Sequence, residues 1–483
     1  MSPALLILLS IGLPLVAAVV IMTLDRYPDI REGVTLTTAA LLGLILWQLL
    51  GHWQAGASGA LVLAEPLPQL PLAFTLEPLG LLFAVVASSL WLVTSIYAIG
   101  YMRGHHETHQ TRFYAAFAIA IASVMLMVFA ANLFTLFIGY ELLTLSTYPL
   151  VTHAGTAEAR RSGRVYLGIL MGTSIGLFLL AMLITWQVAG TLDFTAGGIL
   201  AGKLDPSWAI GLYLLFILGV GKAAVMPLHG WLPAAMVAPT PVSALLHAVA
   251  VVKAGVFTVL KITLYIFGPD FIQASGANAW IIWLPAITIL AASLIALTRD
   301  NLKERLAYST VSQLSYIVLG AMLANEMGLL GGALHITMHA FAKITLFFAA
   351  GAILVAAHKT RVSELDGLGR AMPITFTAFL LASLSIIGLP PFGGMWSKWY
   401  LGLGTVAAEQ WLLLAVLLLS SLLNIAYLLI IPVRAFFKQP PAEQTPGLHE
   451  APWTCLLGMS VPALMCVVLF FYPEPFYSLA KAL

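Results

Sequence analysis

Residues 219 to 255 read GVGKAAVMPLHGWLPAAMVAPTPVSALLHAVAVVKAG, a stretch that combines features which rarely occur together in an apolar segment. It contains the lysines Lys222 and Lys253, the histidines His229 and His247, and four prolines. Proline interrupts a helix, and a lysine at the centre of a membrane helix costs about 2.5 to 3.5 kcal/mol on insertion scales. We therefore expect a functional polar segment that the rest of the chain holds inside a bilayer.

The composition supports a membrane location for the whole chain. Of its 483 residues, 61% are hydrophobic and 9% are charged, and the mean hydropathy is +0.98. Soluble domains carry roughly 25% charged residues, so this is an integral membrane protein. The net charge of +2 and the scattered basic residues argue against nucleic acid as a partner. The two cysteines, Cys455 and Cys466, match no metal-binding spacing and are interpreted as packing residues.

Apolar stretches of about 18 residues or more predict an all-α fold with fourteen membrane spans. The first stretch lacks the basic start and the cleavage site of a signal peptide, so it counts as a span. No soluble domain is expected, and the longest connections are 51 to 76 and 189 to 208. The predicted spans are 3 to 24, 33 to 50, 77 to 101, 112 to 129, 131 to 152, 164 to 188, 209 to 236, 241 to 267, 280 to 298, 303 to 323, 328 to 356, 372 to 405, 411 to 437 and 453 to 478.

The basic residues test this count independently. Fifteen of the 22 lysines and arginines fall in odd-numbered loops, whereas the even-numbered loops contain one, Lys203. Positive charge stays in short cytoplasmic loops. This segregation predicts a multi-pass protein of the cytoplasmic (inner) membrane with both termini on the outer face.

Several titratable residues lie within the predicted spans. Lys261 is about a turn and a half from the end of its span, so snorkelling to the interface and a functional role are equally good interpretations there. The more deeply placed groups favour a proton or ion pathway, because intramembrane ionisable residues commonly mark one. These deeper groups are Glu141, Lys222, Lys253 and Lys343.

Two predicted spans combine a proline break with a lysine. Lys222 precedes VMPLHGWLP, which contains Pro227 and His229, and Lys398 follows GLPPFGGMW, which contains Pro390 and Pro391. Each break frees backbone carbonyls that need polar partners, so we expect a hydrated pocket there. The breaks lie five spans apart, which predicts two inverted five-helix repeats. The predicted parts are a three-helix segment at 1–111, repeats at 112–267 and 268–437, and a terminal helix at 438–483.

His335, His339 and Lys343 occupy positions i, i+4 and i+8, on one helix face. This ladder favours proton transfer, because histidine titrates near neutral pH and desolvation favours the neutral form of lysine. His247 and Lys253 lie on different faces of their span and would need a neighbouring helix or water to connect. No phosphate-binding glycine motif is present, and no carboxylate or cysteine accompanies the histidines, so neither a cofactor nor a metal is expected.

The same residues carry a family resemblance. The segments FIGYELLTLSTYPLV (137 to 151), GKAAVMPLHGWLPAAMVAPTPVSALLHAVAVVKAG (221 to 255), LHITMHAFAKITLFFAAG (334 to 351) and SIIGLPPFGGMWSKWYL (385 to 401) resemble the antiporter-like subunits of Mrp cation/proton antiporters and of respiratory complex I. YELLTLSTYPLV is most similar to the Mrp D subunit, whereas PTPVSALLHAVAVVKAG is more similar to the large A subunit, so the paralogue stays open.

The resemblance implies a proton relay in the membrane plane. It implies that Glu141 pairs with Lys222, and that opening this pair drives a proton towards Lys253. The other implied relay residues are His247, His335, His339, Lys343 and Lys398, with the proton passing from Lys343 to Lys398. Such subunits work within a hetero-oligomer, together with other membrane subunits.

Three functions follow from these expectations. The first is a proton-translocating subunit of a Mrp-type Na⁺/H⁺ antiporter, with no catalytic chemistry of its own. The second is the proton-pumping subunit of a complex I-like assembly, such as an NADH:quinone oxidoreductase, a hydrogenase or an inorganic-carbon uptake system. The third is a structural membrane anchor, which the intact set of titratable residues disfavours.

Overall fold

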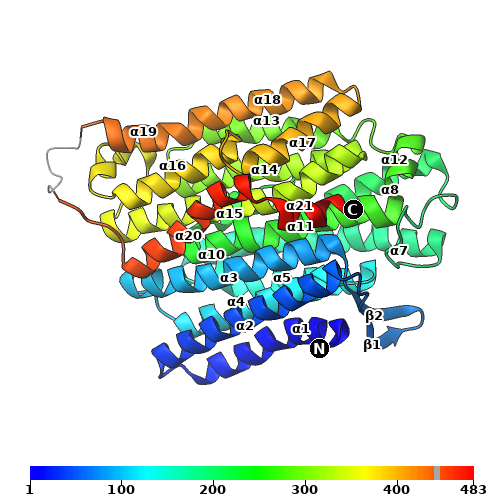
Figure 1. Ribbon diagram of the computed structural model, residues 1–483, viewed down its shortest axis with the longest axis horizontal. Helices are drawn as coiled ribbons and strands as arrows, with labels where there is room; N and C mark the ends of the chain where they lie inside the picture. The colour runs from blue at the N-terminus through cyan, green and yellow to red at the C-terminus, as the bar shows by residue number, and fades with distance from the viewer. Residues whose placement is uncertain (440–446) are drawn as a thin grey trace.

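The computed structural model describes residues 1–439 and 447–483, and nearly all of its regular structure is helical (Figure 1). The elements in chain order are α1 (Pro3–Thr23), α2 (Pro28–Gln54), β1 (Ala60–Leu67), β2 (Leu70–Thr75), α3 (Pro78–Gly104), α4 (Gln110–Val128), α5 (Leu133–Val151), α6 (Ala157–Thr173), α7 (Leu179–Ala189), α8 (Pro206–Gly219), α9 (Trp231–Ala234), α10 (Thr240–Ala244), α11 (Val251–Lys261), α12 (Pro269–Ser275), α13 (Trp283–Thr298), α14 (Leu302–Leu323), α15 (Glu326–Ala357), α16 (Pro373–Ile387), α17 (Gly394–Ala407), α18 (Trp411–Asn424), α19 (Ile430–Phe437), α20 (Trp453–Phe471) and α21 (Glu474–Lys481).

The helices confirm the predicted membrane spans. Within the described residues, eleven helical runs are long and apolar enough to cross a bilayer, and α8, α13 and α16 are shorter apolar helices. Three of the long runs are continued through π-helical turns, which join α6 to α7, α10 to α11 and α18 to α19. Each of the fourteen predicted spans corresponds to one of these runs or shorter helices.

The loops segregate to the two ends of the helical bundle. One end, called here the hairpin end, holds β1, β2, α12 and both chain termini (Figure 1). Its loops contact one another through bridges such as Asn132 with Asp193. The other end, called the basic end, holds most of the lysines and arginines in the loops, and it is tied by contacts such as Arg112 to the carbonyl of His153 at 2.8 Å. The alternation of odd and even loops is therefore as the charge pattern predicts.

The connection 51 to 76 contains regular structure. Strands β1 and β2 form an antiparallel hairpin over 60–75. The second strand is held by the bundle, since Thr75 N donates to the Phe129 carbonyl at 2.7 Å and Ala73 N donates to the Thr135 hydroxyl at 3.1 Å. These partners lie more than 50 residues away in sequence, so local patterns could not indicate that the bundle holds this strand.

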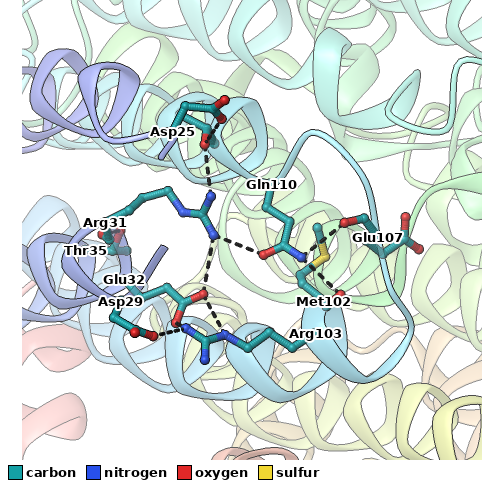
Figure 2. A network of polar contacts seen from close by, with 10 residues as sticks. Asp25, Asp29, Arg31, Glu32, Thr35, Met102, Arg103, Glu107 and Gln110 are labelled. Atoms are coloured by element: carbon teal, nitrogen blue, oxygen red, sulfur yellow. Dashed lines mark hydrogen bonds and ion pairs between the residues drawn. The ribbon is translucent and has the colours of Figure 1, made fainter. Parts of the chain in front are cut away.

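At the basic end, a charged network joins the first helices to the rest of the bundle. Figure 2 shows Arg31 and Glu32 of α2 facing Arg103 of α3 and Gln110 of α4. Glu32 accepts from Arg103 at 2.6 Å, and Arg31 donates to Gln110 at 3.0 Å. Arg31 and Glu32 are buried, so their charges depend on this pairing.

Both predicted helix breaks are present. Helix α8 ends at Gly219, and a 3₁₀ turn, Gly221–Ala223, and irregular backbone follow until the four-residue α9. Helix α16 ends at Ile387, where Gly388 has a φ of +90° that favours glycine. A third interruption was not predicted: the run from α10 to α11 passes through a π-helical turn and then Ala250, with φ −124° and ψ −74°.

Candidate functional site

At the first break, Lys222 is fully buried and bound by α5. Its Nζ donates to the Tyr140 carbonyl at 2.8 Å and to the Thr144 hydroxyl at 2.5 Å. The same nitrogen lies 3.2 Å from the centroid of the Tyr140 ring. A desolvated ammonium over an aromatic face gains about 2 kcal/mol or more, which offsets part of its burial cost. The break therefore places Lys222 in a polar, aromatic binding site.

The implied ion pair between Glu141 and Lys222 is not formed in this structure. Both carboxylate oxygens of Glu141 are buried without a hydrogen-bond partner among the described residues. The helical geometry explains this, because successive residues are rotated by about 100°. Tyr140 and Thr144 face Lys222, whereas Glu141 is on the flank beside the exposed Leu142 and Leu145.

The centre of the site is a direct contact between Lys253 of α11 and His339 of α15. Lys253 Nζ lies 2.7 Å from His339 Nδ1, and both residues are buried. Helix α15 therefore contacts Lys253 directly, but no hydrogen bond extends this contact to His247 within the described residues. A lysine and a histidine at this distance can share a proton, because each can act as donor in one protonation state and acceptor in the other.

His335 continues this contact towards the second break. Its ring lies 5.7 Å from that of His339 and stacks on the Tyr316 ring at 5.6 Å. Its Nδ1 is 2.8 Å from the Ser397 hydroxyl, and its Nε2 is 3.1 Å from Gln313 Oε1. Both ring nitrogens therefore have partners.

Lys398 stands on the far side of Tyr316, next to the second break. Its Nζ is 4.9 Å from the centroid of that ring. The ammonium donates to the carbonyl of Ile387, the last residue of α16, at 3.1 Å and to the Ser421 hydroxyl at 3.0 Å. Lys398 also lines a largely apolar cavity of about 730 Å³ between α16, α17 and α18.

Lys343 does not lie between the central contact and Lys398, contrary to the implied order. Its Nζ donates to the Ser309 hydroxyl at 2.8 Å, and Ser309 accepts from Tyr427 at 3.1 Å. Asn424 Oδ1 is the alternative acceptor for the single proton of the Tyr427 hydroxyl. The ladder on α15 consequently forks: one branch leaves through His335 towards Lys398 and the other through Lys343 towards α18.

The remaining predicted residues are less well connected. His247 is buried, and neither of its ring nitrogens has a partner among the described residues; its ring packs on Phe347 at 4.6 Å. His229 lies beside the Tyr308 ring at 6.1 Å. Pro227, Pro390 and Pro391 lie in the irregular backbone of the two breaks, at cis peptide bonds.

The segment around Lys222 and helix α11 are in close backbone contact. A Cβ added to Gly255 would lie 2.3 Å from the carbonyl carbon of Lys222. Only glycine permits this approach. The first break and the helix of Lys253 are therefore packed together, although no hydrogen bond joins their lysines.

Most of the hydroxyl and amide partners of these groups were not predicted from the sequence. Ser309, Gln313 and Tyr316 are three of them, and they follow a helical spacing of i, i+4 and i+7 on α14. This polar stripe on an otherwise apolar span is the sequence signal that could have identified them. Among the residues that the structure describes, no three histidine, cysteine, aspartate or glutamate side chains gather as metal ligands.

Comparisons with known proteins identify the family of the chain. Residues 130–424 match the family described as NADH:quinone oxidoreductase/Mrp antiporter, TM, and residues 67–114 match the complex I chain 5 N-terminus family. NADH-quinone oxidoreductase subunit N of Desulforudis audaxviator is 34% identical, over 87% of this chain and 89% of that protein. Subunit L of Mycobacterium tuberculosis is 33% identical over 80% of this chain, which spans 60% of the length of that relative.

A solved structure shares the whole fold. A chain of the Mrp complex from Dietzia sp. DQ12-45-1b superposes with a TM-score of 0.88 at 21% identity, covering 99% of this chain and 96% of that one. At this identity the likeness concerns the fold.

Proposed function

Because the chain belongs to the membrane-domain family shared by NADH:quinone oxidoreductases and Mrp antiporters, we propose that it is a subunit that conducts protons between its two broken helices. The observation that carries the proposal is the contact between Lys253 and His339 at 2.7 Å. It joins two helices across the buried centre, and intramembrane ionisable groups of this kind mark proton pathways.

The proton steps follow from the contacts. A protonated Lys253 donates to the unprotonated Nδ1 of His339, which leaves a neutral amine and a charged imidazolium. The imidazolium then releases its other proton, from Nε2, towards His335 or Lys343. Lys222 influences the start of this path, because its charge is held by Tyr140 and Thr144 and any movement at the break changes that binding.

Glu141 supports a hetero-oligomeric assembly. Its carboxylate is buried without a partner in the described part of the chain, which is costly for an ionised group. We infer that movement of the first break brings Lys222 to Glu141, or that another membrane subunit supplies a cation beside it. Either event would couple the relay to the rest of the complex.

We place the subunit in the cytoplasmic membrane, with the hairpin end on the outer face. The basic loops at the opposite end support this orientation through the positive-inside rule. The coupled reaction proposed first is Mrp-type Na⁺/H⁺ antiport. A redox-driven proton pump is the second candidate, and the curated relatives support it, because the two compared here are NADH-quinone oxidoreductase subunits.

Reconstitution of the native complex tests the proposal. We expect His339→Leu to reduce proton flux in vesicles by at least about 100-fold. This is the lower end of the rate contribution of a single acid–base residue. His52→Leu, at the end of α2 and outside the network, is the matched control and should retain flux. A His339→Leu complex that assembles and translocates protons at the wild-type rate would contradict the proposal. Dependence of the flux on sodium or on a redox substrate separates the two candidates.

A further inference from the structure

A second buried lysine contact lies outside the relay described above. Lys261, the last residue of α11, is fully buried, and its Nζ is 2.5 Å from Glu77 Oε1. The snorkelling interpretation of Lys261 is therefore wrong. Aromatic rings surround the ammonium, with the Phe194 centroid at 4.2 Å and the Tyr265 centroid at 4.9 Å.

Glu77 places this ion pair next to the hairpin end. The glutamate directly precedes α3 and follows β2, and 12% of its side chain is exposed. Phe194 and Tyr265, which cover the pair, are themselves only partly buried. Although Glu77 is the N-cap residue of α3, its side chain makes no capping hydrogen bond, so its carboxylate is free to interact with Lys261.

The ion pair and the central contact share one face of α11. Lys253, Phe257 and Lys261 are spaced at i, i+4 and i+8, which aligns them along the helix. At 1.5 Å per residue the two lysines are separated by about 12 Å. The Phe257 ring lies between them, 5.8 Å from Lys261 Nζ and 5.5 Å from the Phe83 ring of α3.

The local backbone supports a functional interpretation. A π-helical turn, Ile262–Phe267, begins directly after Lys261, and such turns frequently occur at functional sites. A purely stabilising role is a weak explanation of the pair, because buried ion pairs are often no more stabilising than apolar residues of the same volume.

Building on the proposed function, we propose that Glu77 and Lys261 form a proton-exchange site that connects the hairpin end to Lys253. In one step the Lys261 ammonium gives a proton to the Glu77 carboxylate, which leaves an amine and a carboxylic acid. The acid releases the proton to water at the partly exposed edge. The amine then accepts a proton from the Lys253 ammonium when movement of Phe257 admits water between them. The steps are reversible, so the same residues serve for uptake.

Lys261→Arg tests the proposal in the reconstituted complex. Arginine keeps the charge and the pairing with Glu77 but does not release a proton. We expect normal assembly and a loss of proton flux of about tenfold or more. A stabilising ion pair would instead be rescued by arginine, so a flux loss smaller than tenfold overturns the proposal.

A double variant without either charge tests the proposal even if the single variant misfolds. Glu77→Gln combined with Lys261→Met removes both charges and should assemble with the same loss of flux. Wild-type flux in this double variant overturns the proposal. If neither Lys261→Arg nor the double variant assembles, the ion pair is a structural element and the proposal is also overturned. The control is Asp366→Asn with Arg434→Met, which removes an ion pair at the basic end and should retain flux.

Comparison of His339→Leu with Lys261→Arg separates failure of the Glu77–Lys261 site from failure of the proposed function. If His339→Leu abolishes flux while Lys261→Arg retains it, the relay stands and the Glu77–Lys261 site is wrong. If His339→Leu also retains flux, the proposed function itself is wrong.

Discussion

At the first break, Lys222 Nζ lies over the Tyr140 ring and bonds to one backbone carbonyl and one threonine hydroxyl. At the second break, Lys398 Nζ lies over the Tyr316 ring and bonds to one backbone carbonyl and one serine hydroxyl. The two tyrosines belong to α5 and α14, the fifth and tenth spans, and the lysines belong to the seventh and twelfth. This offset of five spans supports the proposed repeats at 112–267 and 268–437.

The two sites differ in their access to the surroundings. Lys222 is fully buried, and the neighbouring Glu141 carboxylate has no partner in the described chain. Lys398 is only partly buried and borders a cavity of about 730 Å³. From this difference we propose two roles: the first lysine responds to movement of charged groups, and the second exchanges protons with water that enters the cavity.

The largest effect is expected at the first break. Lys222→Ala removes the charge that is proposed to influence the start of the proton path, so proton flux should fall by at least about 100-fold while the protein still inserts. Flux in vesicles, together with the amount of assembled complex, measures this. Normal flux with normal assembly would show that Lys222 does not influence the proton path.

At the second break, Lys398→Arg should reduce flux by about tenfold or more without affecting assembly, because guanidinium keeps its proton. Lys398→Glu should be milder, since a carboxylate in a partly desolvated site can titrate near neutral pH. The three proteins are compared at equal amounts in vesicles. An arginine variant with wild-type flux would make Lys398 a fixed charge.

The hydroxyl partners of the two lysines test the difference in access. Thr144→Val leaves the sealed Lys222 ammonium short of one acceptor, which should cost about 1 to 3 kcal/mol of stability. Ser421→Ala should cost less than about 1 kcal/mol, because water in the cavity can replace the hydroxyl. Thermal unfolding of the purified complex compares them. Equal losses would contradict the assignment of one sealed and one accessible site.

The smallest effects are expected from the tyrosine hydroxyls. Tyr140→Phe and Tyr316→Phe keep the rings over the lysines and remove one hydrogen bond each, to Lys222 N and to the Leu417 carbonyl. Each should cost about 0.5 to 1.5 kcal/mol and leave flux almost unchanged. A large loss of flux in either variant would show that the hydroxyl takes part in proton transfer.

Most of the fold was predictable from sequence because membrane spans and proline breaks are local signals. Apolar length, basic loops and the prolines at 227 and 390 gave the spans, their alternation and two of the interruptions. The interruption at Ala250 was not predictable, since no proline or glycine occupies that position. It depends on packing against other helices.

The candidate site was predictable as a set of residues but not as a set of contacts. Lysines and histidines in apolar spans are conspicuous, and the spacing of His335 and His339 placed them on one face. Which helix each group meets depends on tertiary packing. That packing directs Lys343 towards Ser309, pairs Lys261 with Glu77 and leaves the Glu141 carboxylate without a hydrogen bond to Lys222.

The central claim is that protons pass through the contact between Lys253 and His339, and Lys253→Arg tests it most directly. Arginine keeps the positive charge and can still donate to His339, but it does not give up its proton. The measurement is proton flux in vesicles that contain the assembled complex, at matched protein levels. We predict an assembled Lys253→Arg complex with flux reduced by at least about 100-fold, whereas flux at the wild-type rate would contradict the account.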